Sequence, residues 1–339
     1  MHAPDQIHHG SRQRYDIRPS LLIQKLPPPE RIAYDRAMDF GKVSSTNGID
    51  FSLPPDPPAN ASVFNRRPPQ TTKPNVLLGL PVWTHPGYVG KIFPVGTKSH
   101  DYLYHYSRQF PTIELNSTFY GYRTTVLEKW RDTAPEGFLF CPKLPKEITH
   151  DLRLVATERA TQQFVKTMEI FGDKLGVAWM LLPESFGPER RDTLLSYVRA
   201  WPRSIPLAVE LRDRRWFENQ TALEELFAAF EETATTPIIT DAAGRRDVLH
   251  QRLTNSTVVL RFLGNLLHPS DFTRLDTWVE RLHEWITNGV TTVYIFLHQP
   301  EEDHTIELAE HLADRLRTVC GIETQSPQRV QRLTQQQFF

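Results

Sequence analysis

The chain has 339 residues, with 39 Lys and Arg against 40 Asp and Glu, so its formal net charge at neutral pH is −1. This length suits one large domain or two small ones with tails. The balanced charge gives no overall attraction to DNA, RNA or an anionic membrane, so a nucleic-acid role would need a local basic patch.

The cysteines and the apolar runs exclude further classes. Cys141 and Cys320 are too few and too far apart in the chain for a disulfide framework or a four-ligand zinc site. Residues 1–16 lack the apolar core of a signal peptide, and no apolar run reaches transmembrane length. We therefore expect a cytoplasmic protein that does not insert into membranes.

Proline crowds the first part of the chain, in residues 25–30, 52–60 and 66–74. Proline lacks a backbone donor and favours extended conformations, so residues 1–74 are predicted to form a Pro-rich arm, partly disordered or docked on the main body. Residues 34–43 (YDRAMDFGKV) carry the aromatic and apolar side chains that would suit docking.

A regular alternation of strands and helices begins at Asn75. Apolar residues at three- and four-residue spacing predict helices over 157–172, 219–232 and 274–289, whereas 242–256 carries the weakest helix pattern. Strands are predicted over residues 76–83, 112–119, 138–145, 177–183, 206–213, 237–241, 257–263 and 292–298.

Eight such alternations in roughly 250 residues predict an α/β fold, a (β/α)8 TIM barrel over residues 75–322, followed by a C-terminal tail over 323–339. A doubly wound open sheet is the alternative. It usually has fewer strands, and no glycine-rich phosphate loop follows the first strand.

The segment TIELNSTF (112–119) places polar side chains on one face of a predicted strand. With a period of two, Glu114 and Asn116 share one face, and Ile113 and Leu115 share the other. In a barrel the apolar face meets the helices, so the polar face is expected to point inward near the C-terminal end, where barrel enzymes place their sites.

The same asymmetry recurs on five other strands. Two explanations are open for these charges: an internal ion-pair network, or a ligand pocket, which we favour because six buried charges at one end add little stability. The inward residues expected at the strand ends are Glu114, Lys143, Glu210, Arg212, Asp241, Arg261 and His298.

Three chemistries fit this set. Lys143, Arg212 and Arg261, with Arg245 nearby, would hold a phosphate or carboxylate, while Glu114, Glu210 and Asp241 would act as general acid or base. Trp83 and Trp216 offer stacking faces, although large aromatics more often pack in cores. No cofactor is predicted, but the three carboxylates with His298 also suit a divalent metal.

Residues 89–120, 134–150, 207–217, 241–271 and 293–303 closely resemble the YecE-like family, domain of unknown function 72, with the motifs in the family's order. The resemblance implies a TIM barrel without an established reaction; nucleic-acid binding has been suggested for members by fold similarity alone. The chain departs from the family pattern at GLPVW (79–83) and at Leu182.

The sequence therefore leads to three functional hypotheses. The first is a hydrolase-like barrel that binds a small or polymeric anionic ligand, phosphate- or sugar-containing, at its mouth. The second is a metal-dependent phosphodiesterase that uses Glu114, Glu210, Asp241 and His298 as ligands. The third is a non-catalytic module whose arm recruits a protein partner of unknown identity.

Overall fold

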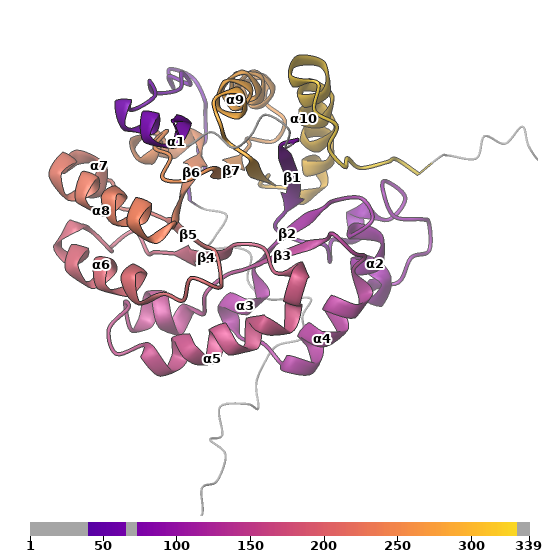
Figure 1. Ribbon diagram of the computed structural model, residues 1–339. Helices are drawn as coiled ribbons and strands as arrows, with labels where there is room; N and C mark the ends of the chain where they lie inside the picture. Colours follow the sequence, from indigo (N-terminus) through magenta and orange to yellow (C-terminus); the bar gives the residue numbers. More distant parts are fainter. Residues whose placement is uncertain (1–39, 66–72, 331–339) are drawn as a thin grey trace, which may run out of the picture. The chain divides into compact units, whose positions relative to one another are not determined.

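The computed structural model describes residues 40–65 and 73–330, in which eight parallel strands alternate with helices (Figure 1). Hydrogen bonding joins the strands in the order β3-β2-β1-β8-β7-β6-β5-β4. Two parallel bridges, Phe140 to Leu175 and Lys143 to Trp179, connect β3 to β4. The strands thus form a nearly closed barrel, and the TIM-barrel prediction is confirmed.

All eight strands lie within the ranges predicted from periodicity, or within one residue of them. The strands are β1 (Asn75–Leu80), β2 (Thr112–Leu115), β3 (Leu139–Pro142), β4 (Ala178–Leu181), β5 (Leu207–Glu210), β6 (Thr236–Asp241), β7 (Thr257–Leu263) and β8 (Thr292–His298). The α-helices are α1 (Ala61–Phe64), α2 (Tyr102–Tyr106), α3 (Ser117–Tyr120), α4 (Thr124–Thr133), α5 (Glu158–Met168), α6 (Arg191–Ala200), α7 (Arg215–Glu218), α8 (Gln220–Thr233), α9 (Pro269–Thr287) and α10 (Thr305–Cys320).

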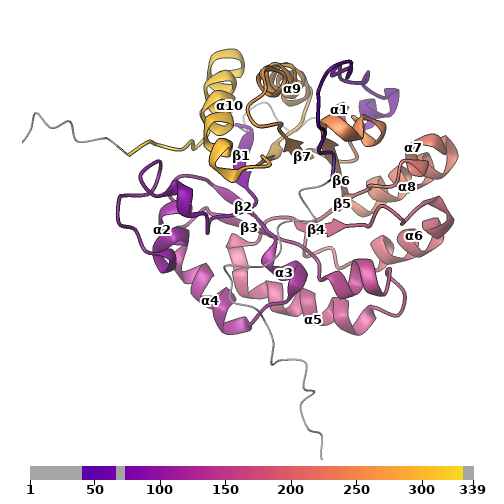
Figure 2. The same ribbon diagram turned by 180° about the vertical axis from the view of Figure 1, so that it is seen from behind.

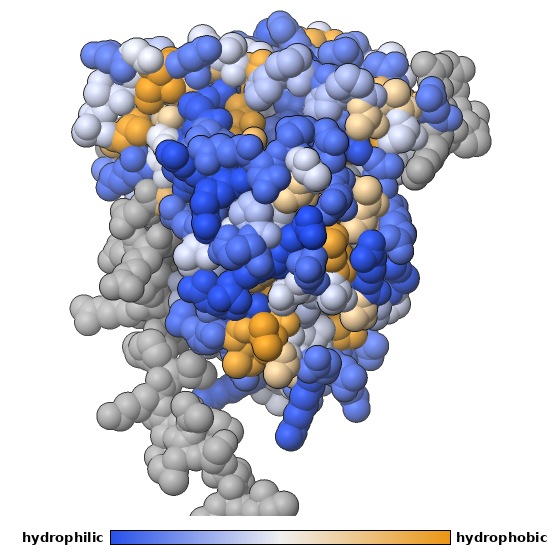
Figure 3. Space-filling view, turned by 90° about the vertical axis from the view of Figure 1, so that its left-hand side faces the viewer, coloured by the Kyte–Doolittle hydropathy of each residue, from blue (hydrophilic) through white to orange (hydrophobic). Residues whose placement is uncertain are grey.

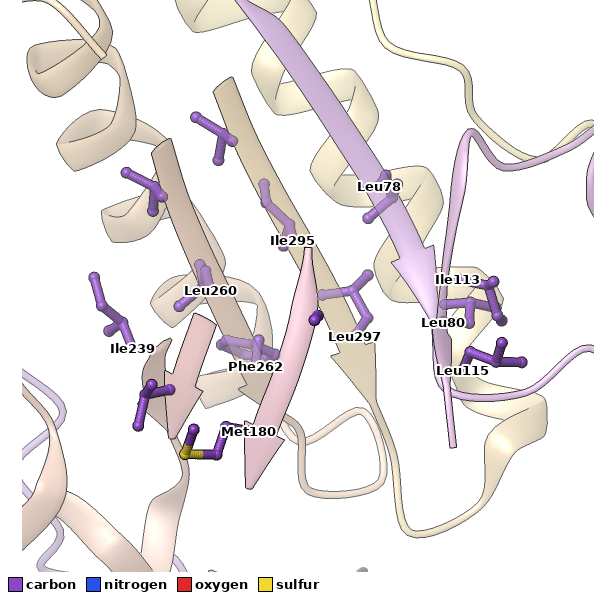
Figure 4. Packing of buried hydrophobic residues seen from close by; sticks show 14 of the residues in the cluster. Leu78, Leu80, Ile113, Leu115, Met180, Ile239, Leu260, Phe262, Ile295 and Leu297 are labelled. Atoms are coloured by element: carbon purple, nitrogen blue, oxygen red, sulfur yellow. The ribbon is translucent and has the colours of Figure 1, made fainter. Parts of the chain in front are cut away.

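Each strand buries both faces, as expected when helices surround a barrel. The outward side chains pack against the helices; Figure 4 shows Leu78 and Leu80 of β1 with Ile295 and Leu297 of β8. The inward side chains form a separate apolar cluster that fills the barrel: Leu77, Cys141, Val177, Trp179, Leu181, Ala208, Ile238, Val259, Tyr294 and Phe296. The barrel interior is a packed core below the strand ends.

Local signals explain where two of the helices begin. Pro269 opens α9 and the His268 side chain accepts a hydrogen bond from the backbone of Ser270, so α9 begins five residues before the predicted start at 274. Asn219 caps α8 by accepting from the Ala222 amide. The weak pattern over 242–256 yields only the 3-10 turn η10 (Ala243–Val248).

Residues 40–65, which we name the strap, pack against the barrel. Both oxygens of Asp56 accept from the Trp285 indole of α9, at 2.9 and 3.1 Å. Asn60, in the turn η4 (Pro58–Asn60), donates to the Gln251 carbonyl and accepts from the Leu253 amide, both at 2.8 Å. Figure 2 shows α1 of the strap beside α9. The rest of the predicted arm, residues 1–39 and 66–72, lies outside the described residues.

On the face shown in Figure 3, hydrophobic residues occur in small separate groups among hydrophilic ones. Within the part of the chain that the structure describes, no helix has both the length and the apolar character needed to cross a bilayer.

Gly79 provides a test of the packed interior. A Cβ at this inward position of β1 would lie 2.8 Å from the Thr112 side chain and 3.0 Å from the Phe296 ring. Gly79→Ala is therefore expected to destabilise the barrel by about 1–3 kcal/mol. Urea unfolding of the variant measures this, with the exposed helical Ser196→Ala as a control that changes stability by less than about 0.5 kcal/mol. Equal stability of both variants would contradict the close packing.

Candidate functional site

Glu210, the last residue of β5, accepts from four side chains, three of them from the neighbouring strands β4, β6 and β7. It accepts hydrogen bonds from Arg212 at 2.8 Å, Trp179 at 3.1 Å, Thr240 at 3.2 Å and Arg261 at 3.4 Å. Burial opposes its ionisation, but the two guanidinium groups outweigh that effect and lower the pKa of Glu210 to about 2. Glu210 is therefore an ionised anchor for Arg212 and Arg261.

Glu114, at the end of β2, forms the second ionic centre. Its oxygens lie 2.5 Å from the Lys143 Nζ and 2.6 Å from the His298 Nε2. Burial alone would raise the pKa of Glu114, but Lys143 and His298 hold it well below its usual range. Burial also lowers the pKa of His298 to about 4, so its imidazole is neutral. Because ionised Glu114 only accepts, Nε2 carries the imidazole proton and Nδ1 is left as an acceptor.

These six residues, which we call the inner cluster, are nearly inaccessible to solvent: Glu114 0%, Lys143 3%, Glu210 0%, Arg212 7%, Arg261 1% and His298 4% exposed. The cluster contains three cations, two carboxylates and a neutral imidazole, so one positive charge is uncancelled. Arg212 Nη2 and Arg261 Nε are buried and make no hydrogen bond within the described protein. Such uncompensated donors are costly, and they suit an anion.

The strap covers the inner cluster. The Phe40 ring lies 4.1 Å from the guanidinium carbon of Arg212 and 4.5 Å from that of Arg245, and Phe40 is 4% exposed. Phe40 and His298 both line a cavity of about 10 Å³, which has room for about one water molecule. Phe40 was not among the site residues expected from the sequence.

A close backbone approach holds Phe40 in place. Gly41 has φ +80°, and a Cβ there would overlap the Ala242 side chain. Its carbonyl accepts from the Gly244 amide of η10 at 2.9 Å. Glycine is required at position 41 both for the left-handed backbone and for the contact.

Two further expected residues lie near the cluster but bind backbone. Arg245 donates from Nη2 to the Arg212 carbonyl at 2.6 Å and pairs with Glu184 and Asp247. Asn116, which precedes α3, donates to the Pro81 carbonyl at 3.1 Å. Their side chains brace the loops around the mouth of the barrel.

Asp241 does not point into the barrel, and its expected inward position is wrong. It shares the outward face of β6 with Ile239, while Thr240 faces inward. Asp241 is fully buried among Arg246, Arg274 at 2.6 Å and the Trp278 indole at 2.6 Å. It therefore joins β6 to α9 rather than reaching a ligand at the mouth.

The two tryptophans expected as stacking faces pack elsewhere. Trp83 lies edge-on to Trp130 of α4, with ring centroids 5.0 Å apart. Trp216 in α7 is fully buried and donates to the Phe186 carbonyl at 2.7 Å. Both belong to the core between strands and helices, so neither offers a free face.

The four ligands of the metal hypothesis do not converge. Asp241 lies on the outer face, and guanidinium groups occupy Glu210. Across residues 40–65 and 73–330, no three side chains of ligand type are grouped so that they could hold a metal ion. The residues at the mouth therefore do not fit a divalent cation.

Glu302 is a residue at the mouth that sequence reasoning missed. It belongs to the turn η11 (Glu302–His304), which follows β8, and both of its side-chain oxygens are buried without a hydrogen bond inside the described protein. A loop has no periodicity, so nothing in the pattern distinguishes Glu302 from Glu301 or Asp303.

A larger hollow of about 860 Å³ lies between α5 and α6 and is lined by Thr161, Tyr197 and Trp201 among others. It contains no member of the inner cluster. Size alone therefore does not identify it as the functional site.

Glu210→Gln tests the ionised anchor. Because the pKa is lowered on folding, ionised Glu210 stabilises the fold above about pH 4.5, and this contribution is lost as the pH falls toward 2. The variant is expected to lose roughly 3 kcal/mol of unfolding free energy at about pH 7 and less at about pH 3.5, measured by urea unfolding. Glu232→Gln removes an exposed ion pair with Arg199 and should cost less than about 1 kcal/mol. A loss that does not change with pH would contradict the assignment.

Comparison with known proteins agrees with this architecture. The "UPF0759 protein YecE" of Escherichia coli K12 is 27% identical over 261 residues, 71% of this chain and 93% of the relative. Bacillus subtilis "UPF0759 protein YunF" is 29% identical over 153 residues, 42% of this chain and 52% of that protein.

Structural comparison shows the same fold. The crystal structure of a DUF72 family protein from Enterococcus faecalis V583 matches with a TM-score of 0.59 and 17% identity, over 76% of this chain and 100% of that one. The family model described as "Protein of unknown function DUF72" matches residues 77–331. The chain therefore belongs to the DUF72 family.

Proposed function

We propose that the inner cluster binds a small anionic ligand, phosphate- or sugar phosphate-containing, in an enzyme-like pocket of the hydrolase type. The observation that carries this proposal is the uncancelled positive charge, together with the unpaired N–H groups of Arg212 and Arg261. A bound anion would neutralise the charge and accept from both donors.

The cluster also supports a division of chemical roles. Glu210 is too acidic to carry a proton near neutral pH, and Glu114 likewise remains ionised, so both hold cations instead of acting as general acids. His298 lines the small cavity, and its Nδ1 is an acceptor that could take a proton from water. The roles of base and orienting carboxylate thus fall to His298 and Glu114.

A ligand can enter only if Phe40 moves. The 10 Å³ cavity is smaller than any phosphate, and the Phe40 ring covers Arg212. Other contacts of the strap, such as that of Asp56 with Trp285 of α9, do not involve Phe40. A swing of residues 40–43 alone would therefore open the site.

Calorimetric titration with sulfate and with inorganic phosphate tests the anion site. Arg212→Gln removes a cation with an unpaired donor and is expected to weaken binding at least about tenfold. Arg199→Gln, an exposed arginine on α6, is the matched control and should bind like the wild type. Equal affinities of the wild type, Arg212→Gln and Arg199→Gln would refute the proposal. So would a failure of both the wild type and Phe40→Ala to bind either anion.

Phe40→Ala tests the cover. Removing the ring is expected to raise the affinity for sulfate roughly threefold to tenfold, because the ligand no longer has to displace it. Phe51→Ala is a matched control, since Phe51 lies on the same strap but over Arg246 and Arg274, at 5.6 and 5.2 Å. Affinity that rises in neither variant, or equally in both, would show that Phe40 does not cover the binding site.

A further inference from the structure

The Glu302 carboxyl group is in an environment that an ionised carboxylate would not tolerate. Both oxygens are shielded from water and have no donor among the described residues, although the residue as a whole is partly exposed. An isolated buried charge is far more costly than a buried neutral acid. Burial, with a contribution from the negative charge of Glu114, raises the pKa of Glu302 to about 8.

Two members of the inner cluster act electrostatically on Glu302. Glu114 of β2 and Arg261 of β7 act on its charge with opposite signs, and Glu302 in turn acts on Tyr106 of α2. Asp303, the adjacent acid, is paired with His85 at 2.8 Å, and its carbonyl accepts from Lys91. No cation from the η5 side (Pro86–Tyr88) therefore compensates Glu302.

We propose that the Glu302 side chain is protonated and donates a hydrogen bond, through its carboxyl proton, to an oxygen of the anion bound at the mouth of the barrel. This inference rests on the anion site proposed above. It requires a ligand in which the anionic group carries an oxygen that can accept a hydrogen bond from Glu302. A protonated Glu302 leaves the net charge of the inner cluster at one positive unit. Its ionisation would remove that excess, and the site would reject the anion.

A purely structural role accounts less well for Glu302. A carboxyl group kept for stability would donate its proton to a carbonyl or another acceptor of the protein, as Tyr106 does to the Thr112 carbonyl at 2.9 Å. Neither side-chain oxygen of Glu302 makes a hydrogen bond within the described chain. The unsatisfied donors Arg212 Nη2 and Arg261 Nε belong to the cluster with which it interacts.

The test measures sulfate affinity against pH, because the charge of sulfate does not change between about pH 6.5 and about pH 9.5. Wild-type affinity is expected to fall at least roughly tenfold over this range, as Glu302 ionises. Glu302→Gln keeps a neutral donor, so its sulfate affinity should change much less over the same range. Any decrease that remains is due to deprotonation of Lys143, whose pKa is lowered by burial. Glu301→Gln, at the exposed acid that precedes Glu302, is the matched control and should retain the wild-type profile.

A second measurement requires no ligand. The infrared difference spectrum between wild type and Glu302→Gln at about pH 6.5 should contain the C=O band of a protonated carboxyl group, which disappears by about pH 9.5. Absence of the band overturns the inference, as does a Glu302→Gln profile that falls like the wild type. If the band is present but the wild type and Phe40→Ala bind no sulfate at either pH, the anion site fails, and the donor role with it, while the proton on Glu302 is established.

Discussion

Two buried carboxylates, Glu114 and Glu210, hold the mouth of the barrel together, because each one binds side chains from several strands. Glu114 connects β2 to the ends of β3 and β8 through Lys143 and His298. Glu210 connects β5 to β4, β6 and β7 through Trp179, Thr240 and Arg261. Each carboxylate needs its partners to remain charged in a dry interior, and each set of donors needs its carboxylate.

The two ionic centres meet where the sheet is weakest. Strands β3 and β4 are joined only by isolated bridges, one of them between Lys143 and Trp179. The Lys143 ammonium also lies 5.3 Å from the centre of the Trp179 ring, and Trp179 donates to Glu210. Side chains of both ionic centres thus connect β3 to β4, where backbone pairing is sparse. Closure of the barrel at this junction therefore depends on the same charges as the candidate site.

The sequence was sufficient for the parts of the structure that burial makes periodic. All eight strands were predicted because their two buried faces produce apolar or alternating runs, and Glu114, Lys143, Glu210, Arg212, Arg261 and His298 were placed together because each follows the inward phase. Asp241 failed because it was assigned by its place at the end of a run and not by phase with Ile239. One of its partners, Arg274, lies 33 residues further along the chain on a helix, and strand periodicity cannot predict a contact between residues so far apart in sequence.

Phe40 and Glu302 could not be found in this way. Both lie in segments without a repeat, where the conformation is set by contacts with distant parts of the chain. The placement of the Phe40 ring depends on the fit of Gly41 against Ala242. The protonation of Glu302 depends on the absence of hydrogen-bond donors near its carboxyl group in the described chain. Composition indicated that residues 34–43 could dock, but not where.

The cover over Arg212 has a thermodynamic consequence because it is part of the same chain. A tethered ring competes with any incoming molecule at an effective concentration that is on the order of millimolar for short connections. A stray ion that contacts a single arginine would lose to such a competitor. Only a molecule that engages several groups at once would gain enough to displace it, so at the proposed anion site the strap would select ligands by the number of contacts they make.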